Sequence, residues 1–295
     1  MSDESYLRDI LKSQKLADDS KEMKELREQR DAVEAILREA FPGATIRYGG
    51  SKAKGTLIRD SYDLDLACYL PNDTEGTLED IYKDASKVLS KHYRVEEKTS
   101  AIRLLSNDPD TAGTYTHVDV VPGRYTYDTK SDCYLYQNGA DKGRLKTNLD
   151  VHIEHIRDSG VTDALQLLKL WRVQNSVPVK QFAFELLCVE LLADKKKTSL
   201  PDQIEHVLQS IRDAEEPIKV EDPANPTGND LMPLLTGAWA HLQSVAGQTL
   251  DNIESSGWEA VYGDADSGDD ADVLQKLSIA VHTAQHDQPT KPWSK

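Results

Sequence analysis

The sequence predicts an α+β protein with a mixed α/β N-terminal half and a helical C-terminal half. Residues 63–70 alternate apolar and other side chains, which is typical of a β-strand. Residues 20–41 have helical spacing before that strand, and after about residue 146 the apolar residues recur at helical spacing only. With 295 residues and 38% hydrophobic content, the chain can bury one large core or two smaller ones. We expect an α/β core over residues 1–147 and a helical lobe over residues 148–295.

The N-terminal half begins with a predicted helix over residues 20–41, which is rich in helix formers and is ended by Pro42 and Gly43. A short strand is expected over 44–48, and Gly49-Gly50-Ser51 is expected to be a turn. Further elements follow from the same periodicities: a strand at 63–70, a helix at 78–92, and strands at 101–105 and 114–121, the last ended by Pro122-Gly123.

The C-terminal half is predicted to be helical because its apolar residues are three or four positions apart. The expected elements are a helix over 161–171, a helix over 184–191, an irregular loop over 221–230 (EDPANPTGND), an acidic loop over 262–272 and a last helix near 273–281.

Composition excludes several classes of function. The 51 Asp and Glu residues outnumber the 35 Lys and Arg residues, giving a net charge of −16, and this opposes binding along a nucleic-acid backbone. A small anion neutralised by a metal in a cleft is compatible with that charge. No stretch approaches the roughly 18–20 apolar residues of a membrane span, and the first residues lack the features of a signal peptide. The three cysteines are far apart, so we expect a cytoplasmic protein with free thiols.

Three aspartates form the candidate catalytic group. Asp63 and Asp65 are two residues apart on a predicted strand, so their carboxylates leave the same face about 7 Å apart. Asp119 lies between two valines of another predicted strand and can supply a third carboxylate. Three carboxylates can bind two divalent cations, the arrangement used for in-line phosphoryl transfer. Taken alone, an Asp-x-Asp pair is also typical of a solvated strand face.

The glycine-rich segment upstream favours the catalytic interpretation. Gly49 and Gly50 let backbone amides approach phosphate oxygens, and the Ser51 hydroxyl adds a donor. An ordinary glycine-rich turn is the alternative, but it does not explain a strand before the segment and acids twelve and fourteen residues after Ser51.

These residues resemble the signature of a known family. The run YGGSKAKGTLIRDSYDLDLACYL resembles that of the DNA polymerase beta-like nucleotidyltransferases, and HVDVVPG resembles the strand that bears their third acid. LQLLKLWRVQN resembles their helix with a phosphate-binding lysine, Lys169 here, and FAFELL resembles the next helix. DPANPTGN is similar to a segment of oligoadenylate synthetases. The matches span most of residues 44–262 and are most similar to the cGAS/DncV-like nucleotidyltransferases (CD-NTases).

The resemblance implies a polymerase beta-like core with a helical lobe like that of oligoadenylate synthetases. It implies an enzyme that joins nucleoside triphosphates, ATP among them, into a cyclic di- or trinucleotide in anti-phage (CBASS) signalling, with Mg²⁺, or Mn²⁺ in its place, as two bound ions. Its implied partners are the triphosphates, an activating or regulatory protein from the same operon and a separate effector that receives the product; no membrane is involved. The implied catalytic and metal-binding residues are Asp63, Asp65 and Asp119, and the implied substrate-binding residues are Gly50, Ser51, Lys169, Gln181 and Asp222.

Several alternatives stay open at this stage. The same acids could serve linear transfer to another acceptor, as in CCA-adding or adenylyl-transferring enzymes, or the chain could bind nucleotides without catalysis. Lys169 could be merely solvated, and Asp222 could stabilise its loop rather than contact a base. Gln181 stands where the family often has a serine, and Lys180 could share its contact. The histidines, including His152, are interpreted as structural.

Overall fold

The structure is a computed structural model, and it describes residues 1–62, 64–105, 118–127, 131–139 and 143–264. Asp63, the residues 114–117 expected in a strand, most of the acidic loop and the last predicted helix lie outside these described residues. The helices are α1 (Asp3–Ser13), α2 (Lys21–Ala40), α3 (Gly50–Lys54), α4 (Leu78–Leu89), α5 (Leu149–Arg157), α6 (Thr162–Gln174), α7 (Gln181–Leu191), α8 (Leu200–Asp213), α9 (Pro233–Thr236), α10 (Trp239–Ser256) and α11 (Glu259–Tyr262). The strands are β1 (Thr45–Tyr48), β2 (Leu64–Leu70), β3 (Arg94–Glu97), β4 (Ile102–Leu105), β5 (Val118–Tyr125), β6 (Cys133–Tyr136) and β7 (Arg144–Thr147).

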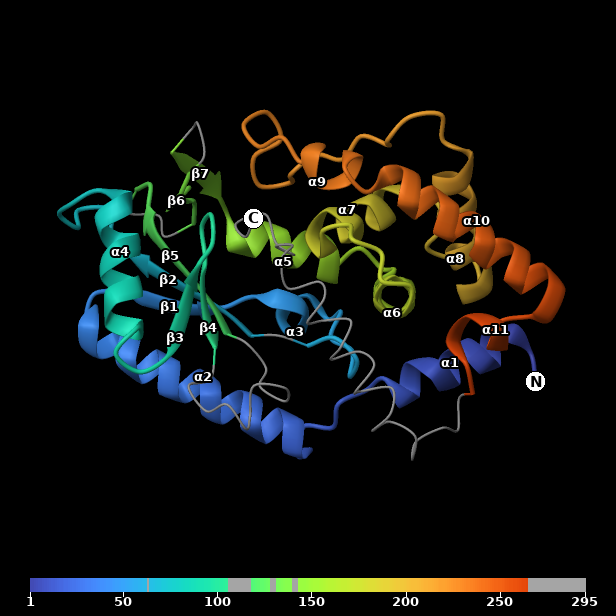
Figure 1. Ribbon diagram of the computed structural model, residues 1–295, viewed down its shortest axis with the longest axis horizontal. Coiled ribbons are helices and arrows are strands. Elements are labelled where there is room, and N and C mark those ends of the chain that lie inside the picture. Colours follow the sequence, from blue (N-terminus) through green and yellow to red (C-terminus); the bar gives the residue numbers. More distant parts are fainter. Residues whose placement is uncertain (63, 106–117, 128–130, 140–142, 265–295) are drawn as a thin grey trace.

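The strands form one mixed sheet in the order β1-β2-β5-β4-β3, with β6 and β7 continuing from the far end of β5 (Figure 1). β2 and β5 are parallel, and the other pairs are antiparallel. β2 and β5 have neighbouring strands on both sides, and helices cover both faces of the sheet, so both strands are almost entirely buried. The predicted α+β class with a mixed sheet is confirmed.

Helices cover both faces of the sheet. Leu64, Leu66, Cys68 and Leu70 pack with α2 and α4 on one face, while Ala67 and Tyr69 pack with α5 on the other. This is the division that the alternation of residues 63–70 predicts. On the α5 side, Arg47 of β1 donates through Nη1 to Oδ2 of Asp150 at 2.8 Å, which joins the first strand to that helix.

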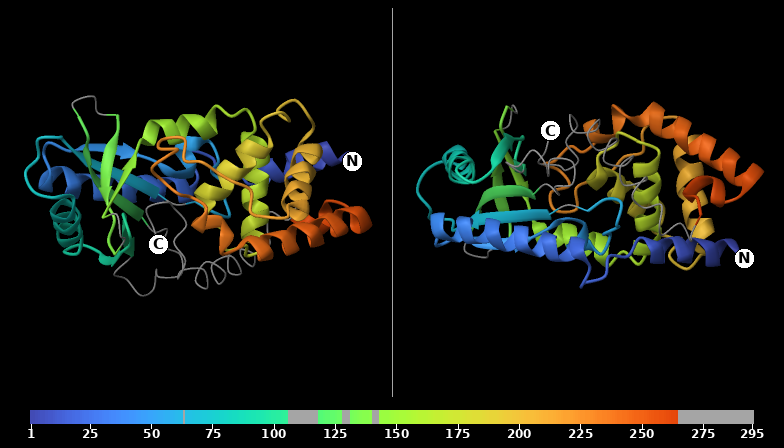
Figure 2. Two further views of the ribbon diagram at one scale, coloured as in Figure 1. Left: turned by 90° about the horizontal axis from the view of Figure 1, so that it is seen from above. Right: turned by 60° about the horizontal axis from the view of Figure 1, so that its bottom comes forward.

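The C-terminal helices build a separate hydrophobic core around the buried residues Trp171, Phe184 and Leu242. Tyr6, Leu7, Ile10 and Leu11 of α1 belong to this core, although α1 precedes the sheet in the sequence. The figures show α1 and α2 following one another along one side of the molecule, α2 beside the strands and α1 beside the C-terminal helices (Figures 1 and 2). None of the helices in the described ranges is both long and apolar enough to cross a membrane.

The first predicted helix is confirmed down to its ends. Ser20 is the N-cap of α2, where its hydroxyl accepts a hydrogen bond from the Met23 amide at 3.2 Å, and Phe41 is the C-cap just before Pro42. A serine N-cap satisfies an amide that has no partner inside the helix. α6 and α7 likewise cover the predicted apolar segments of the second half.

Two local expectations are wrong. Gly49-Gly50-Ser51 is not a simple turn, because Gly49 is the N-cap of α3 and the helix begins at Gly50 and continues through the helix formers that follow Ser51. Pro122-Gly123 does not end its strand either, since β5 continues to Tyr125. Residues 118–120 pair with β4 and residues 123–125 with β6, so Pro122 lies where the neighbour changes and its missing N–H breaks no ladder on that side.

Gly123 is required by packing rather than by backbone conformation. A Cβ atom at this position would lie 2.7 Å from Cδ2 of Leu135 and 3.0 Å from the Tyr134 carbonyl oxygen. We expect Gly123→Ala to lower the free energy of unfolding by about 1–3 kcal/mol, because an overpacked core must move backbone to relieve the contact. Urea denaturation measures the loss. Gly43→Ala is the control, since its nearest contact would be an ordinary 3.6 Å; equal stability of both variants and the parent would contradict the packing argument.

The three cysteines, Cys68, Cys133 and Cys188, are free thiols, as predicted, and all are buried. Burial raises the pKa of the Cys68 and Cys133 thiols to about 12. Neutral thiols in these cores act as small apolar side chains rather than as nucleophiles.

Candidate active site

Two of the predicted acids face each other across neighbouring strands. Asp65 of β2 and Asp119 of β5 are register partners in a parallel pair, so their side chains leave the same face of the sheet one strand spacing apart, about 4.8 Å. Arg103 of β4 is in turn the register partner of Asp119. The three residues form a lateral row across β4, β5 and β2, and all three are buried.

Arg103 holds Asp119 through a bidentate ion pair. Its Nε lies 2.9 Å from Oδ1 and its Nη2 lies 3.0 Å from Oδ2 of that carboxylate. Fork-to-fork pairing of this kind fixes the plane of the carboxylate as well as its charge. Because both side chains are at most 3% exposed, the pair also satisfies two charges that would be costly to bury alone.

The acid row suits a divalent metal in the chemistry of its donors. Carboxylate oxygens are the ligands that Mg²⁺ prefers, and a carboxylate offers about four lone-pair positions, so Asp119 can bind an arginine and a cation together. Asp63, the third predicted ligand, lies outside the described residues. Within the described part of the chain, no group of three or more His, Cys, Asp or Glu side chains is placed to hold a metal ion. Asp65 and Asp119 therefore fit as two ligands of a site that would need Asp63.

The glycine-serine segment lies directly against the acid row. A Cβ atom on Gly50 would lie 2.5 Å from Oδ2 of Asp65, and Gly50 has φ +75°, a conformation that glycine adopts without strain. Ser51 follows as a buried residue of α3, and its hydroxyl has no hydrogen-bond partner among the described residues. The structure thus brings Gly50 to Asp65, and Ser51 is the next residue of the chain.

Lys169 is buried and not solvated. The middle of α6 packs on all sides, and the Lys169 side chain is only 2% exposed. Its ammonium group donates to the carbonyl oxygen of Thr56 at 3.4 Å, and the Thr56 amide donates to the Ser51 carbonyl at 2.9 Å. One residue therefore separates Lys169 from the helix that carries Ser51.

Gln181 is the first residue of α7, and its side-chain amide has a fixed orientation. Nε of Arg172 donates to the Gln181 amide oxygen at 2.8 Å, while the same guanidinium donates to two backbone carbonyls of the loop before α7. The Gln181 amide nitrogen is buried and has no hydrogen-bond partner among the described residues. The arrangement leaves a donor at the start of α7. Lys180 is the N-cap residue of the same helix.

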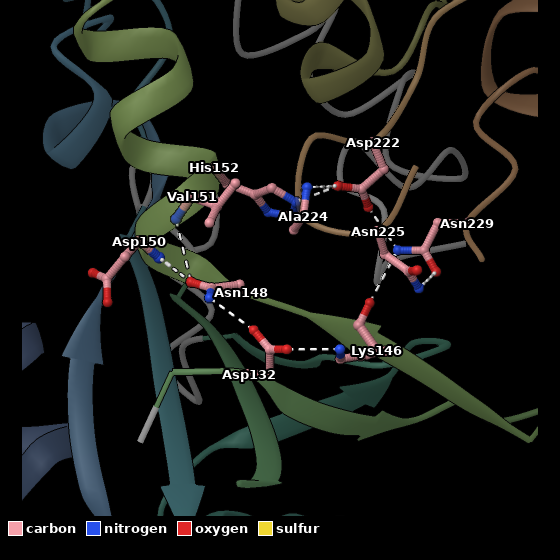
Figure 3. Close-up of polar contacts among 10 residues, drawn as sticks. All are labelled: Asp132, Lys146, Asn148, Asp150, Val151, His152, Asp222, Ala224, Asn225 and Asn229. Carbon is pink, nitrogen blue, oxygen red and sulfur yellow. Dashed lines mark hydrogen bonds and ion pairs between the residues drawn. The ribbon is translucent and has the colours of Figure 1, made fainter. Parts of the chain in front are cut away.

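Asp222 belongs to a polar network that joins loop 221–230 to its neighbours (Figure 3). Its carboxylate bonds to Nε2 of His152 at 2.7 Å, accepts from the Ala224 amide at 2.8 Å and accepts from Nδ2 of Asn229 at 2.6 Å. The Asn229 amide group also donates to the Lys146 carbonyl of β7 at 3.0 Å. Asp222 and Asn229 therefore join loop 221–230 to α5 and the end of the sheet, and the predicted structural use of His152 agrees with this placement.

The Asp222 carboxyl carries a pH-dependent part of the stability. Burial alone would raise its pKa, but the hydrogen bonds and charge of His152 and the bonds from Asn229 and Ala224 lower it overall. A pKa that is lower in the folded state contributes stability above the unfolded value of about 3.9, and this stability is lost as the pH falls through the folded value.

We expect Asp222→Asn to lower the free energy of unfolding by about 1.5–3 kcal/mol near pH 7, because hydrogen bonds to a charged group are lost. The difference in the free energy of unfolding between the variant and the parent protein should shrink as the pH falls below about 4. Urea denaturation from pH 3 to pH 8 measures this difference. Glu221→Gln, an exposed carboxylate next in the chain, is the control; a gap that stays constant over the whole range would contradict the assignment.

Three charged residues of this region were not predicted from the sequence as parts of the site: Arg103, Arg172 and Glu185. Arg103 stands between the buried Ile102 and Leu104, and Glu185 interrupts the apolar run of α7. A charge inside an apolar element is costly to bury alone and therefore signals a partner. The sequence therefore indicated that these charges have partners, but it did not identify the partners.

The sequence and the fold were compared with known proteins. Residues 30–110, which carry Gly50, Ser51 and Asp65, match the family model described as "Nucleotidyltransferase domain". Among curated proteins, none matches this sequence.

Solved structures match nearly the whole chain. CdnC of E. coli MS115-1, solved with ATP and also in a complex with HORMA-deltaN, is 18% identical, with a TM-score of 0.65 for the ATP structure over 90% of this chain and 98% of that one. The CD-NTase CdnG of Bradyrhizobium diazoefficiens, solved with GTP, is 13% identical with a TM-score of 0.62 over 92% and 97% of the two chains. DncV of Vibrio cholerae, a cyclic AMP-GMP synthase, is 14% identical with a TM-score of 0.61 over 95% of each chain.

Residues 30–110 are therefore similar to a nucleotidyltransferase domain. Its overall fold, with the mixed sheet and the helical C-terminal region, is that of the CD-NTases.

Proposed function

We propose that this protein is a nucleotidyltransferase that joins nucleoside triphosphates into a cyclic di- or trinucleotide and releases pyrophosphate. The observation that carries the proposal is the register pairing of Asp65 with Asp119 beside Gly50 and Ser51. The nucleotidyltransferase domain match supports the reaction class. The fold shared with a cyclic AMP-GMP synthase supports a cyclic product.

The acids would hold the metal. Asp65 and Asp119, together with Asp63, are the residues that would bind Mg²⁺, or Mn²⁺ in its place, and the bound ions would neutralise triphosphate oxygens and lower the pKa of an attacking hydroxyl. Arg103 keeps the Asp119 carboxylate oriented for that purpose.

The other residues would bind the phosphates. Ser51 and the amide nitrogen of Gln181 are donors with no hydrogen-bond partner among the described residues. Lys169 supplies positive charge at Thr56, whose amide donates to the Ser51 carbonyl. A ribose hydroxyl of a second nucleotide would form a bond to the α-phosphorus as its proton is lost to water. The bond to the β-phosphate oxygen would break, and pyrophosphate would leave with the electron pair. A second round on the linear intermediate closes the ring.

The proposal includes the setting of the reaction. The reaction would take place in the cytoplasm, because its substrates are nucleoside triphosphates. The product would act on a separate effector in anti-phage signalling. A regulatory protein from the same operon would control the enzyme, a proposal supported by the complex of CdnC with HORMA-deltaN. Helices of the described ranges offer no membrane span.

A product assay tests the proposal. The full chain is incubated with all four ribonucleoside triphosphates and Mg²⁺ or Mn²⁺, with and without the proteins of neighbouring genes, and the products are treated with phosphatase before mass spectrometry. A cyclic oligonucleotide has no terminal phosphate, so it survives phosphatase and is the expected result. Linear chains, or nucleotides attached to tRNA, would replace the cyclic assignment by linear transfer. Triphosphate binding without any product under all these conditions would identify a catalytically silent protein.

A further inference from the structure

Four side chains form a buried ionic group between α3, α6 and α7, which we name the Glu185 cluster. Its members are Lys54 at the end of α3, Thr56 just after it, Lys169 of α6 and Glu185 of α7. Glu185 is 1% exposed. A carboxylate at that depth needs hydrogen bonds and opposite charge to remain ionised.

Glu185 obtains its hydrogen bonds and its opposite charge from two different parts of the chain. Its Oε1 accepts from the Thr56 hydroxyl at 2.8 Å, and its Oε2 pairs with the Lys54 ammonium group. Lys169 lies close enough to act on the same carboxylate by its charge. Burial is the largest influence and by itself raises the pKa of Glu185, but Lys54, Lys169 and Thr56 together lower it below its ordinary value. The carboxylate is therefore ionised at neutral pH.

The cluster brings two lysines to one buried carboxylate. Lys54 pairs with Glu185 directly, and Lys169 acts on the same carboxylate by its charge. Without Glu185, the charges of the half-buried Lys54 and the buried Lys169 would repel each other, and each ammonium group would lose its preferred position. Lys54 also faces the ring of Phe182 with its Nζ 5.9 Å from the ring centroid, which restrains it from the side of α7.

The cluster is continuous with the helix that carries Ser51. Thr56 uses its hydroxyl for Glu185, its carbonyl for Lys169 and its amide for the Ser51 carbonyl. Lys54 and Thr56 follow Ser51 by three and five residues, on the same short segment. A single carboxylate of α7 therefore sets the end of α3 and the ammonium group of Lys169 relative to one another.

We propose that Glu185 is a positioning residue of the triphosphate site, which holds Lys169 beside the Ser51 helix and thereby sets the affinity for nucleoside triphosphates. The inference rests on the proposed function, because the anion it serves is the substrate of that reaction. Glu185 itself does not touch the substrate, since its two oxygens are engaged by Thr56 and Lys54. Its effect is exerted through Lys169.

A positioning role predicts a particular kinetic change. Lys169 would contact phosphates in the ground state and in the transition state alike. Its displacement therefore weakens the binding of both states to a similar degree. Glu185→Gln should therefore raise the Kd and KM for triphosphates by about tenfold or more, the loss expected for a hydrogen bond to a charged group, while kcat changes much less. A residue that only supports folding would change thermal stability and leave the KM of the folded protein unaltered.

A double-mutant cycle with Lys169 tests the inference. Kd for a non-hydrolysable ATP analogue with Mg²⁺ is measured by calorimetry for the parent chain, Glu185→Gln, Lys169→Gln and the double variant, at a temperature where each is folded. If Glu185 acts through Lys169, the double variant binds nearly as well as Lys169→Gln alone. Effects that multiply would overturn the proposal. Glu190→Gln, the same change at an exposed position of α7, is the control and should bind within about twofold of the parent.

The outcomes separate this inference from the proposed function. If the parent chain binds no triphosphate, the proposed function fails and the inference fails with it. If the parent and the control bind but Glu185→Gln binds equally well, the inference alone is wrong. If Glu185→Gln does not fold, the Kd of the double variant is compared with the Kd of Lys169→Gln instead. The double variant removes one charge of each sign, so it leaves no unpaired charge from this pair. A further tenfold loss there would overturn the proposal.

Discussion

Asp65→Asn should lower the rate of Mg²⁺-dependent pyrophosphate release by roughly a thousandfold or more, because several kcal/mol of transition-state stabilisation by metal ions depend on a complete ligand set. An asparagine keeps the shape of the side chain but removes its charge. A coupled pyrophosphate assay measures the rate, and circular dichroism establishes that the variant is folded. Asp65 is better suited to this test than Asp119, whose loss would also leave the buried Arg103 without the carboxylate that it binds.

Asp73→Asn serves as the control for Asp65→Asn. Asp73 is an exposed acid that follows β2, so the same chemical change there should leave turnover within about twofold of the parent, as for most surface substitutions. Unchanged turnover of the Asp65 variant would reject the metal site proposed for this row of residues. Loss of activity in both variants would point to a general effect of lowering the negative charge.

Gly50→Ala should reduce turnover by about a hundredfold or more, since a displacement of about 1 Å at reacting groups has effects of that size. The added Cβ would lie 2.5 Å from Oδ2 of Asp65, so either the carboxylate or the start of α3 must move. The φ of +75° adds backbone strain of about 1–2 kcal/mol for any residue with a Cβ. Pyrophosphate release and thermal denaturation measure the two effects separately.

Gly257→Ala distinguishes the contact with Asp65 from the backbone strain. Gly257 has φ +76° at the end of α10, and nothing lies within 4 Å of its Cβ position. Its substitution should cost a similar backbone strain and leave turnover unchanged. If Gly50→Ala were no less active than Gly257→Ala, the close approach of Gly50 to Asp65 would have no part in the reaction.

The elements that the sequence predicted best are those that their own residues determine. α2 has a serine N-cap, a continuous apolar stripe and a Pro-Gly pair beyond its end, and all three act within the segment. β2 alternates so regularly that its two faces could be assigned before its neighbours were known. The spacing from Ser51 to Asp65 likewise predicted that Gly50, Ser51 and Asp65 would meet.

Other elements had no such local pattern. β3, β6 and β7 are strands of only four residues. Their strand conformation depends more on pairing with neighbouring strands than on the alternation of their own side chains. β5 passes through Pro122 because the missing N–H falls where the adjacent strand changes from β4 to β6. The energetic cost of a proline in a strand therefore depends on which strands lie beside it. A short stretch of sequence does not identify those neighbours.

The partners of the buried charges follow the same rule. The sequence by itself determined the class of fold, the main helices, the central strand and the approach of Gly50 to Asp65, because periodicity and short spacings act over a few residues. Only the tertiary structure decided that Arg103 holds Asp119, that Glu185 pairs with Lys54, and that Asp222 binds His152. These pairs are 16 to 131 residues apart in the chain, and the choice of partner for a buried charge depends on which segments the packed cores bring together.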